Sequence, residues 1–154
     1  VLLEHEQVAV EVDDVAPQLL NLGIQRRALG GRRGRLLGLR LGGRLRWTFD
    51  VPDELLVRRF PLMLLQPLVE NAVTHGIEPK VSGGELRIAA RLDEGRLRLA
   101  VADTGVGLRE GGSGTGFGLE NVRQRLRALF GEAASLDVRE NSGGGVVATL
   151  EIPA

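Results

Sequence analysis

Apolar and polar residues alternate along five separate stretches of the chain, a pattern typical of strands that bury one face. The alternation predicts strands at residues 44–51, 85–92, 96–102, 135–140 and 146–152. Residues 1–34 give weaker signals, with strand-like alternation at 7–12 and loose helical spacing at 16–29. The pattern therefore indicates structure mainly from residue 44 onward.

Two prolines divide the apolar segment that follows the first predicted strand. Pro61 and Pro67 each suit the first turn of a helix, whereas Gln66, which precedes a proline, is disfavoured in helical backbone. We therefore expect two short consecutive helices. The second should run from about Pro67 to His75 and stop at Gly76, which would serve as a left-handed cap.

A glycine-rich stretch precedes the last predicted helix. It holds seven glycines between Gly105 and Gly118, and apolar residues then recur at helical spacing over 119–130, up to Gly131. The second and third strands, and the fourth and fifth, are joined by short turns of the hairpin type. This order of elements predicts an α/β two-layer sandwich, in which a mixed, mainly antiparallel sheet carries helices on one face.

The composition limits the class of protein. A chain of 154 residues with 43% hydrophobic content can bury one core of ordinary size. Its 20 basic and 20 acidic residues cancel, so we expect no nucleic acid partner. It has no cysteine, no signal peptide and no apolar run near the roughly 18 residues that span a bilayer, which predicts a cytoplasmic, soluble piece. Because it begins with Val1, we expect a fragment whose membrane attachment, if any, lies upstream.

The charge is uneven along the chain. Residues 15–49 contain eight arginines and no acidic residue. Such a run is usually a solvated or poorly ordered segment, and the alternative is a surface for an acidic partner or a phosphate backbone.

The first stretch that indicates chemistry is Glu70-Asn71, with His75 four residues beyond the asparagine on the same helical face. A carboxamide oxygen is a hard, neutral ligand that suits Mg²⁺. Asn71 could therefore hold the ion without adding negative charge beside a phosphate chain. On its own, an asparagine here would more often cap the helix or face solvent.

The second stretch is Asp103-Thr104-Gly105-Val106-Gly107, at the end of a predicted strand. The glycines allow another group to approach the backbone closely, and a partly buried carboxylate suits an amine donor. Taken alone, this string is a weak signal, because a strand-end acid followed by glycines often only makes a turn.

The third stretch is Gly114-Thr115-Gly116-Phe117-Gly118-Leu119, a loop that leads into a helix. Free N–H groups and the helix dipole at such a position favour phosphate oxygens. The stretch is neither a Walker A loop, since no Gly-Lys-Ser/Thr follows, nor a dinucleotide-binding turn.

The three stretches occur in the order and spacing of a known family. The chain resembles the GHKL ATP-binding fold of histidine kinases, gyrase-type ATPases and Hsp90, with LQPLVENAVTHGI as its N box, DTGVGL as its G1 box and GTGFGLENVRQRL as its G2 box. The sequence of these boxes is most similar to that of LytS-type sensor kinases. The resemblance covers residues 39–153, which implies a catalytic domain at 39–154 and an N-terminal segment at 1–38 of unassigned structure.

The resemblance also implies roles for single residues and the cofactors ATP and Mg²⁺. Asn71 would ligate Mg²⁺, with Glu70 and His75 supporting the metal and phosphates, and Asp103 would accept a hydrogen bond from the adenine amine. The remaining assignments are Gly105 and Gly107 beside the adenine, a lid formed by Gly114, Gly116, Gly118 and Leu119 with mobility expected over about residues 106–115, and Arg123 either reaching phosphate or lying on the surface.

Two departures from the family pattern limit these implications. The hydrolytic glutamate of the gyrase and Hsp90 branches is replaced by Pro67, so we expect little ATP hydrolysis. The last hairpin reads Gly145-Val146 where the family often has Gly-Thr, which puts one adenine-side hydrogen bond in doubt.

The expected function is that of a sensor histidine kinase domain that donates the γ-phosphoryl of Mg-ATP to a histidine elsewhere. His5 lacks the sequence context of an acceptor, so the acceptor domain would lie upstream, in a full-length protein that forms homodimers and serves a response regulator. Two alternatives stay open: a nucleotide-sensing module that transfers no phosphate, and an arginine-rich interaction protein on an inert fold.

Overall fold

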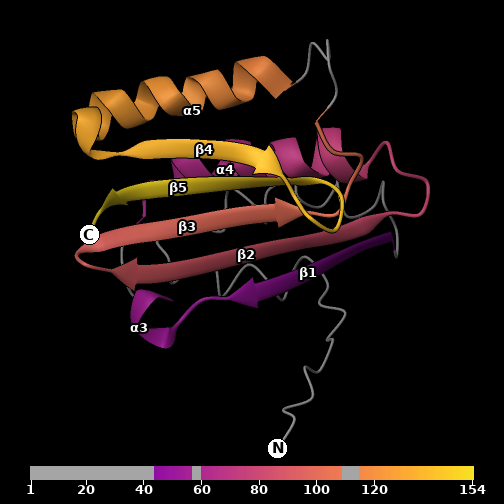
Figure 1. The fold of residues 1–154 in the computed structure, drawn as a ribbon, viewed down its shortest axis with the longest axis horizontal. Coiled ribbons are helices and arrows are strands. Elements are labelled where there is room, and N and C mark those ends of the chain that lie inside the picture. The colour runs from indigo at the N-terminus through magenta and orange to yellow at the C-terminus, as the bar shows by residue number, and fades with distance from the viewer. Residues whose placement is uncertain (1–43, 57–59, 109–114) are drawn as a thin grey trace, which may run out of the picture.

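In the part of the chain that the structure describes, the sheet has five strands and a mixed topology (Figure 1). The computed structural model describes residues 44–56, 60–108 and 115–154. Strand β1 is parallel to β2, and the other neighbouring pairs are antiparallel, in the order β1-β2-β3-β5-β4. The strands are β1 (Leu45–Asp50), β2 (Gly84–Asp93), β3 (Arg96–Asp103), β4 (Ser135–Glu140) and β5 (Val146–Pro153), as the alternation predicted.

Two long helices pack on one face of this sheet. They are α4 (Leu62–Asn71), which continues as the π-helix η2 (Ala72–Ile77), and α5 (Thr115–Phe130), which is followed by the 3-10 turn η3 (Gly131–Ala133). A short helix that the pattern did not predict, α3 (Asp53–Leu56), follows β1. The two-layer α/β class is confirmed. Among the described residues, no helix is both long and apolar enough to cross a membrane.

One hydrophobic core joins the helices to the sheet. Along β2, β3 and β5 buried residues alternate with more exposed ones, so each strand turns one face toward the helices. Ile88 and Leu99 of the sheet and Leu68 of α4 belong to the same buried cluster, each at most 2% exposed. Burial of side chains of this size contributes about 1.5–3 kcal/mol each. This core fixes the sheet ends relative to the helix ends.

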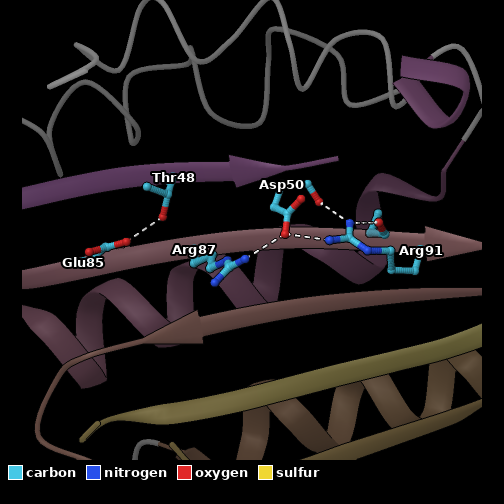
Figure 2. Close-up of polar contacts among 6 residues, drawn as sticks. Thr48, Asp50, Glu85, Arg87 and Arg91 are labelled. Atoms are coloured by element: carbon cyan, nitrogen blue, oxygen red, sulfur yellow. Dashed lines mark hydrogen bonds and ion pairs between the residues drawn. The ribbon is translucent and has the colours of Figure 1, made fainter. Parts of the chain in front are cut away.

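The opposite face of the sheet carries charged side chains. Arg87 and Arg91 of β2 both donate to the Asp50 carboxylate of β1 at 2.7 Å, and Thr48 donates to Glu85 at 2.7 Å (Figure 2). Arg91 also reaches the Asp50 carbonyl at 3.0 Å. These contacts attach the edge strand β1 to β2 across the solvent-facing side.

The prediction of two helices separated at Pro67 is wrong, because Pro67 lies inside the continuous helix α4. A proline has no N–H, so the carbonyl four residues earlier, that of Met63, loses its helical donor. The Arg125 guanidinium of α5 donates to that carbonyl at 2.8 Å. Packing of Leu64 and Leu68 into the core, at 0% and 1% exposure, outweighs the local preference against helix before proline.

The helix ends also differ from the prediction at two points. The helical segment does not stop at Gly76, because the π-helix η2 continues to Ile77. Gly76 is also not among the glycines with positive φ. Helix α5 begins at Thr115, four residues before the predicted start. Its end is confirmed, because Gly131 takes a left-handed conformation with φ +59°.

Candidate functional site

Three of the predicted boxes converge at one end of the sheet. Strand β3 ends there at Asp103, η2 leads away from the end of α4, and β5 begins at the same end (Figure 1). The contact between Arg125 and Met63 places the later part of α5 beside the start of α4. The two helices are therefore antiparallel, so the start of α5 lies toward the end of α4.

Asp103 is the centre of this end of the sheet. Among the residues that the structure describes, it is the one polar or charged side chain that is fully buried, at 2% exposure. Its carboxylate accepts a hydrogen bond from the Gly105 N–H at 2.8 Å and another from the Val146 N–H. Burial raises the pKa of Asp103, and the two N–H donors and the charge of Lys80 oppose that rise. A buried carboxylate held by neutral donors remains available to one more donor.

Glycines from separate elements surround this carboxylate. A Cβ at Gly76 would lie 2.7 Å from Oδ1 of Asp103, and a Cβ at Gly145, where φ is +84°, would lie 2.5 Å from the same oxygen. A Cβ at Gly105 would overlap the backbone of Gly76. The elements meet around Asp103 only because these three positions have no side chain. Gly76 is thus required for packing against Asp103 and not as a helix cap.

The turn after Asp103 is held by a set of hydrogen bonds. Thr104 exchanges two with Glu85: its N–H donates to the Glu85 carbonyl at 3.1 Å, and its hydroxyl accepts from the Glu85 N–H at 2.9 Å. Val106 donates its N–H to the Gly76 carbonyl at 2.9 Å. Gly107, predicted to border the adenine, follows with φ +81°. These hydrogen bonds hold the Asp103–Gly107 segment in a fixed turn conformation.

Two further residues that sequence reasoning missed contact this turn. Lys80 donates through Nζ to the Thr104 carbonyl at 2.6 Å, and Asn141 donates through Nδ2 to the Asp103 carbonyl at 3.1 Å. From the sequence, Asn141 lies only in the turn between the last two predicted strands, and Lys80 lies in no predicted box. The available signal was weak: both lie beside glycine pairs that suggest close approach, Gly83-Gly84 and Gly143-Gly144.

The predicted metal-binding group lies at the junction of α4 and η2. Glu70 and Asn71 are half-buried and His75 is exposed. Glu70 accepts from the Gln66 amide at 3.1 Å, a contact along its own helix. The junction is π-helical, with an i→i+5 bond from the Glu78 N–H to the Val73 carbonyl at 2.8 Å, a feature often found at functional sites. Within the described residues no three acidic or histidine side chains form a metal-binding group. A metal here would rely on Asn71 and on oxygens of its ligand.

The predicted phosphate-binding residues lie at the start of α5. Gly116 and Gly118 fall in its first turn, Leu119 is 6% exposed and belongs to the core, and Gly114 lies outside the described residues. The predicted lid likewise falls largely on residues 109–114, outside that part. Arg123 makes an ion pair with Glu120 of its own helix at 3.8 Å, the contact expected of a surface arginine.

The chain is similar to known proteins over most of its length. Residues 57–154 match the family described as histidine kinase-, DNA gyrase B- and HSP90-like ATPase. The chain is 34% identical over 114 residues to the sensor histidine kinase YesM of Bacillus subtilis, a match over 71% of the chain and 20% of YesM. It is 31% identical over 118 residues to the sensor histidine kinase/phosphatase LytS of Staphylococcus aureus, over 68% of the chain and 20% of LytS.

A solved structure shows the same fold. The nucleotide-free catalytic domain of the histidine kinase ThkA superposes with a TM-score of 0.60 at 20% identity, over 88% of this chain and 94% of that one. The chain spans about a fifth of the length of the curated relatives that it matches. The similarity therefore concerns one domain of those longer proteins.

Proposed function

The chain belongs to the histidine kinase-, DNA gyrase B- and HSP90-like ATPase family, and from this premise we propose that it binds Mg-ATP and donates the γ-phosphoryl group to a histidine outside residues 44–154. The resemblance to LytS-type sensor kinases is confirmed by relatives that carry that name. One observation carries the proposal: a buried Asp103 carboxylate held between backbone N–H donors, where glycines let η2, the Asp103–Gly107 turn and the start of β5 approach one another closely.

Asp103 is suited to read the base. An ionised carboxylate only accepts hydrogen bonds, and adenine presents an exocyclic amine that donates. Because Gly105 and Val146 fix the carboxylate, it need not reorganise when the base binds. Val146 contributes its backbone N–H and has no hydroxyl, so the adenine-side contact that the family's Gly-Thr pair supplies is absent from that side chain. Gly105 and Gly107 would border the base.

Asn71 is the residue we assign to the metal. It stands half-buried at the last position of α4, followed by the π-helical turn. Mg²⁺ prefers oxygen ligands and keeps much of its water, so one carboxamide and the phosphate oxygens form a sufficient set. When bound, the ion would neutralise charge on the phosphates. Glu70 and His75 would support this arrangement from the same helical segment.

The start of α5 is suited to the phosphates. The 16-residue helix begins at Thr115 directly after the glycine-rich stretch, and its first N–H groups have no partner within the helix. Gly116 and Gly118 place no side chain beside these groups. Gly114 and Arg123 complete the assignment as predictions, together with the lid over the nucleotide.

Transfer to a protein histidine is favoured over hydrolysis. The position that holds the hydrolytic glutamate in the related ATPases is Pro67, which lies inside α4 and offers no base. The acceptor histidine, a homodimeric full-length protein, the response regulator and a cytoplasmic location stay predictions, because the chain matches only about a fifth of its relatives' length.

Mg²⁺-dependent ATP binding tests the site. Calorimetry of the 154-residue chain with ATP should give binding that Mg²⁺ strengthens, and Asn71→Ala should weaken binding about tenfold in Mg²⁺ while leaving binding in EDTA nearly unchanged. Gln124→Ala, which removes an exposed amide from α5, is the matched control and should behave as wild type. If Asn71→Ala retained the full Mg²⁺ effect, Asn71 would not hold the metal.

Phosphoryl transfer tests the activity. With γ-labelled ATP the isolated chain should acquire no acid-labile label, because residues 44–154 contain only His75 and the segment before them only His5. Addition of the upstream region of the same protein should produce label on a histidine there. Binding of ATP without any transfer would favour the nucleotide-sensing alternative, and label on His5 would make residues 1–34 the substrate segment.

A further inference from the structure

Lys80 is the only lysine in the chain. The other nineteen of its 20 Lys and Arg residues are arginines. The two cations differ chemically: arginine presents a broad planar fork, whereas lysine carries a compact ammonium that fits beside a single carbonyl oxygen. The position of this one ammonium is therefore informative.

The backbone of Lys80 is held on both sides in the turn between η2 and β2. Its N–H donates to the Ile77 carbonyl at 3.0 Å, and its carbonyl accepts from the Gly83 N–H at 2.8 Å and from the Arg44 guanidinium at 3.1 Å. A lysine on such a turn presents its side chain from a fixed point. This differs from a surface lysine on a solvated helix face, whose side chain loses entropy with every contact it makes.

The ammonium of Lys80 completes the hydrogen bonding of Thr104. The Thr104 N–H and hydroxyl are both paired with the backbone of Glu85, and the Thr104 carbonyl accepts from Lys80 Nζ at 2.6 Å. Thr104 stands between Asp103 and Gly105, whose N–H donates to the Asp103 carboxylate. A change in the Thr104 carbonyl therefore turns the same peptide unit that presents the Gly105 N–H.

The charge of Lys80 acts on Asp103 as well. Among the described residues it is the charged side chain whose field reaches the Asp103 carboxylate, and it lowers the pKa of that group against the effect of burial. In the described ranges of the chain, no guanidinium pairs with Asp103, in contrast to Asp50, which pairs with both Arg87 and Arg91. Lys80 thus favours the ionised carboxylate while its ammonium donates to the Thr104 carbonyl.

We infer that Lys80 is a positioning residue for adenine recognition: it fixes the Asp103–Gly105 turn through the Thr104 carbonyl and favours the carboxylate form that accepts a hydrogen bond. The inference rests on the proposed function, since it concerns how Asp103 reads the base. It predicts that Lys80 affects ATP and GTP binding differently, because adenine presents an amine donor at the position where guanine has a carbonyl oxygen, which cannot donate to Asp103.

The test compares Lys80→Met with Arg127→Met in the 154-residue chain. Both changes remove one positive charge and introduce the same side chain, and Arg127 is exposed in the last turn of α5, at the far end from Asp103 (Figure 1). Lys80→Met should lower the affinity for ATP about tenfold and the affinity for GTP by less than about twofold. The tenfold loss is the size expected for one charge-assisted hydrogen bond, and it should affect only the adenine nucleotide. Arg127→Met should leave both affinities at the wild-type value.

The pH dependence separates positioning from a structural role. ATP binding should be lost on acidification as Asp103 takes up its proton, and without the Lys80 charge this loss should begin at a higher pH than in Arg127→Met. Lys80→Arg restores the charge and should return the loss to its wild-type pH. If Lys80 had only a structural role, Lys80→Met would lower the affinities for ATP and GTP alike. It would also leave unchanged the pH at which ATP binding is lost.

Acylation of the folded wild-type chain provides the same comparison without a variant that must fold. With the N-terminal amine blocked, Lys80 is the sole remaining amine, and bound ATP should slow its acylation more than bound GTP does. Acylated protein should then show the selective loss of ATP affinity.

An equal loss of affinity for both nucleotides, or behaviour of Lys80→Met that matches Arg127→Met, would overturn the inference while leaving the proposed function standing. A wild-type chain that binds no ATP would overturn both.

Discussion

Two aspartates lie at opposite ends of the same sheet, and their environments differ. Asp50 ends β1, with its side chain 39% exposed, and accepts from Arg87 and Arg91 at 2.7 Å each (Figure 2). Asp103 ends β3 at the other end of the sheet, is 2% exposed and is held by backbone N–H groups. The arginines hold the pKa of Asp50 below its usual range, whereas burial raises the pKa of Asp103.

From this difference we interpret Asp50 as a structural charge and propose Asp103 as a group that binds a ligand. An exposed carboxylate between two arginines is already satisfied, and such a pair adds at most about 1 kcal/mol to stability. A buried carboxylate without a guanidinium costs free energy in the empty protein, and a ligand that supplies a donor recovers it. Perturbed, buried acids with a shaped space beside them are for this reason candidates for binding sites.

The largest effect on this comparison should come from adding a side chain where the backbone of Gly76 packs against Asp103. Gly76→Ala puts a methyl 2.7 Å from Oδ1, so it should destabilise the fold by about 1–3 kcal/mol and weaken ATP at least about tenfold. Gly118→Ala, in helix α5 with open space around it, is the matched control for stability and should stabilise by about 0.5–1 kcal/mol. Urea unfolding and calorimetry measure both. A stabilising Gly76→Ala would show that the glycine is not needed for packing.

A smaller effect, of opposite sign at the two sites, is expected in the pH dependence of stability. The folded pKa of Asp50 is lowered, so its contribution is present above the unfolded value of about 3.9 and is lost as the pH falls through the folded value. The folded pKa of Asp103 is raised, so ionisation opposes folding as the pH rises from about 3.9 through the folded value.

Asp50→Asn should therefore lose stability relative to wild type as the pH rises, whereas Asp103→Asn should gain it. Unfolding free energies of the three nucleotide-free proteins between pH 3 and 7 measure this difference. Parallel curves for the two variants would contradict the contrast between Asp50, whose charge is stabilised by two arginines, and Asp103, whose charge is opposed by burial.

The strands and the three boxes were predictable because their signals are local. Alternation gave all five strands, and the hairpin turn before Arg96 follows from Glu94-Gly95, both of which take positive φ. The continuous helix α4 was missed because the Arg125 side chain that satisfies the Met63 carbonyl comes from another helix. No property of the sequence around Pro67 reports that contact.

The surroundings of Asp103 could be predicted only in part for the same reason. The acid and the following glycines form a recognisable string, but Gly76, Lys80, Asn141 and Gly145 reach it from other parts of the chain. Gly76 lies in a helical segment, where a glycine before a loop is usually a cap. Its true role depends on a close approach that only the folded chain creates.

Base selectivity tests the assignment of Asp103 most directly. Competition binding of ATP and GTP to wild type and to Asp103→Asn compares an ionised acceptor with an amide that can rotate to present a donor. We predict that wild type prefers ATP by about tenfold to a few hundredfold, the effect of leaving a buried acceptor unpaired, and that Asp103→Asn narrows this gap while weakening ATP. Equal affinity of wild type for ATP and GTP would contradict the account, because Asp103 would then not read the base.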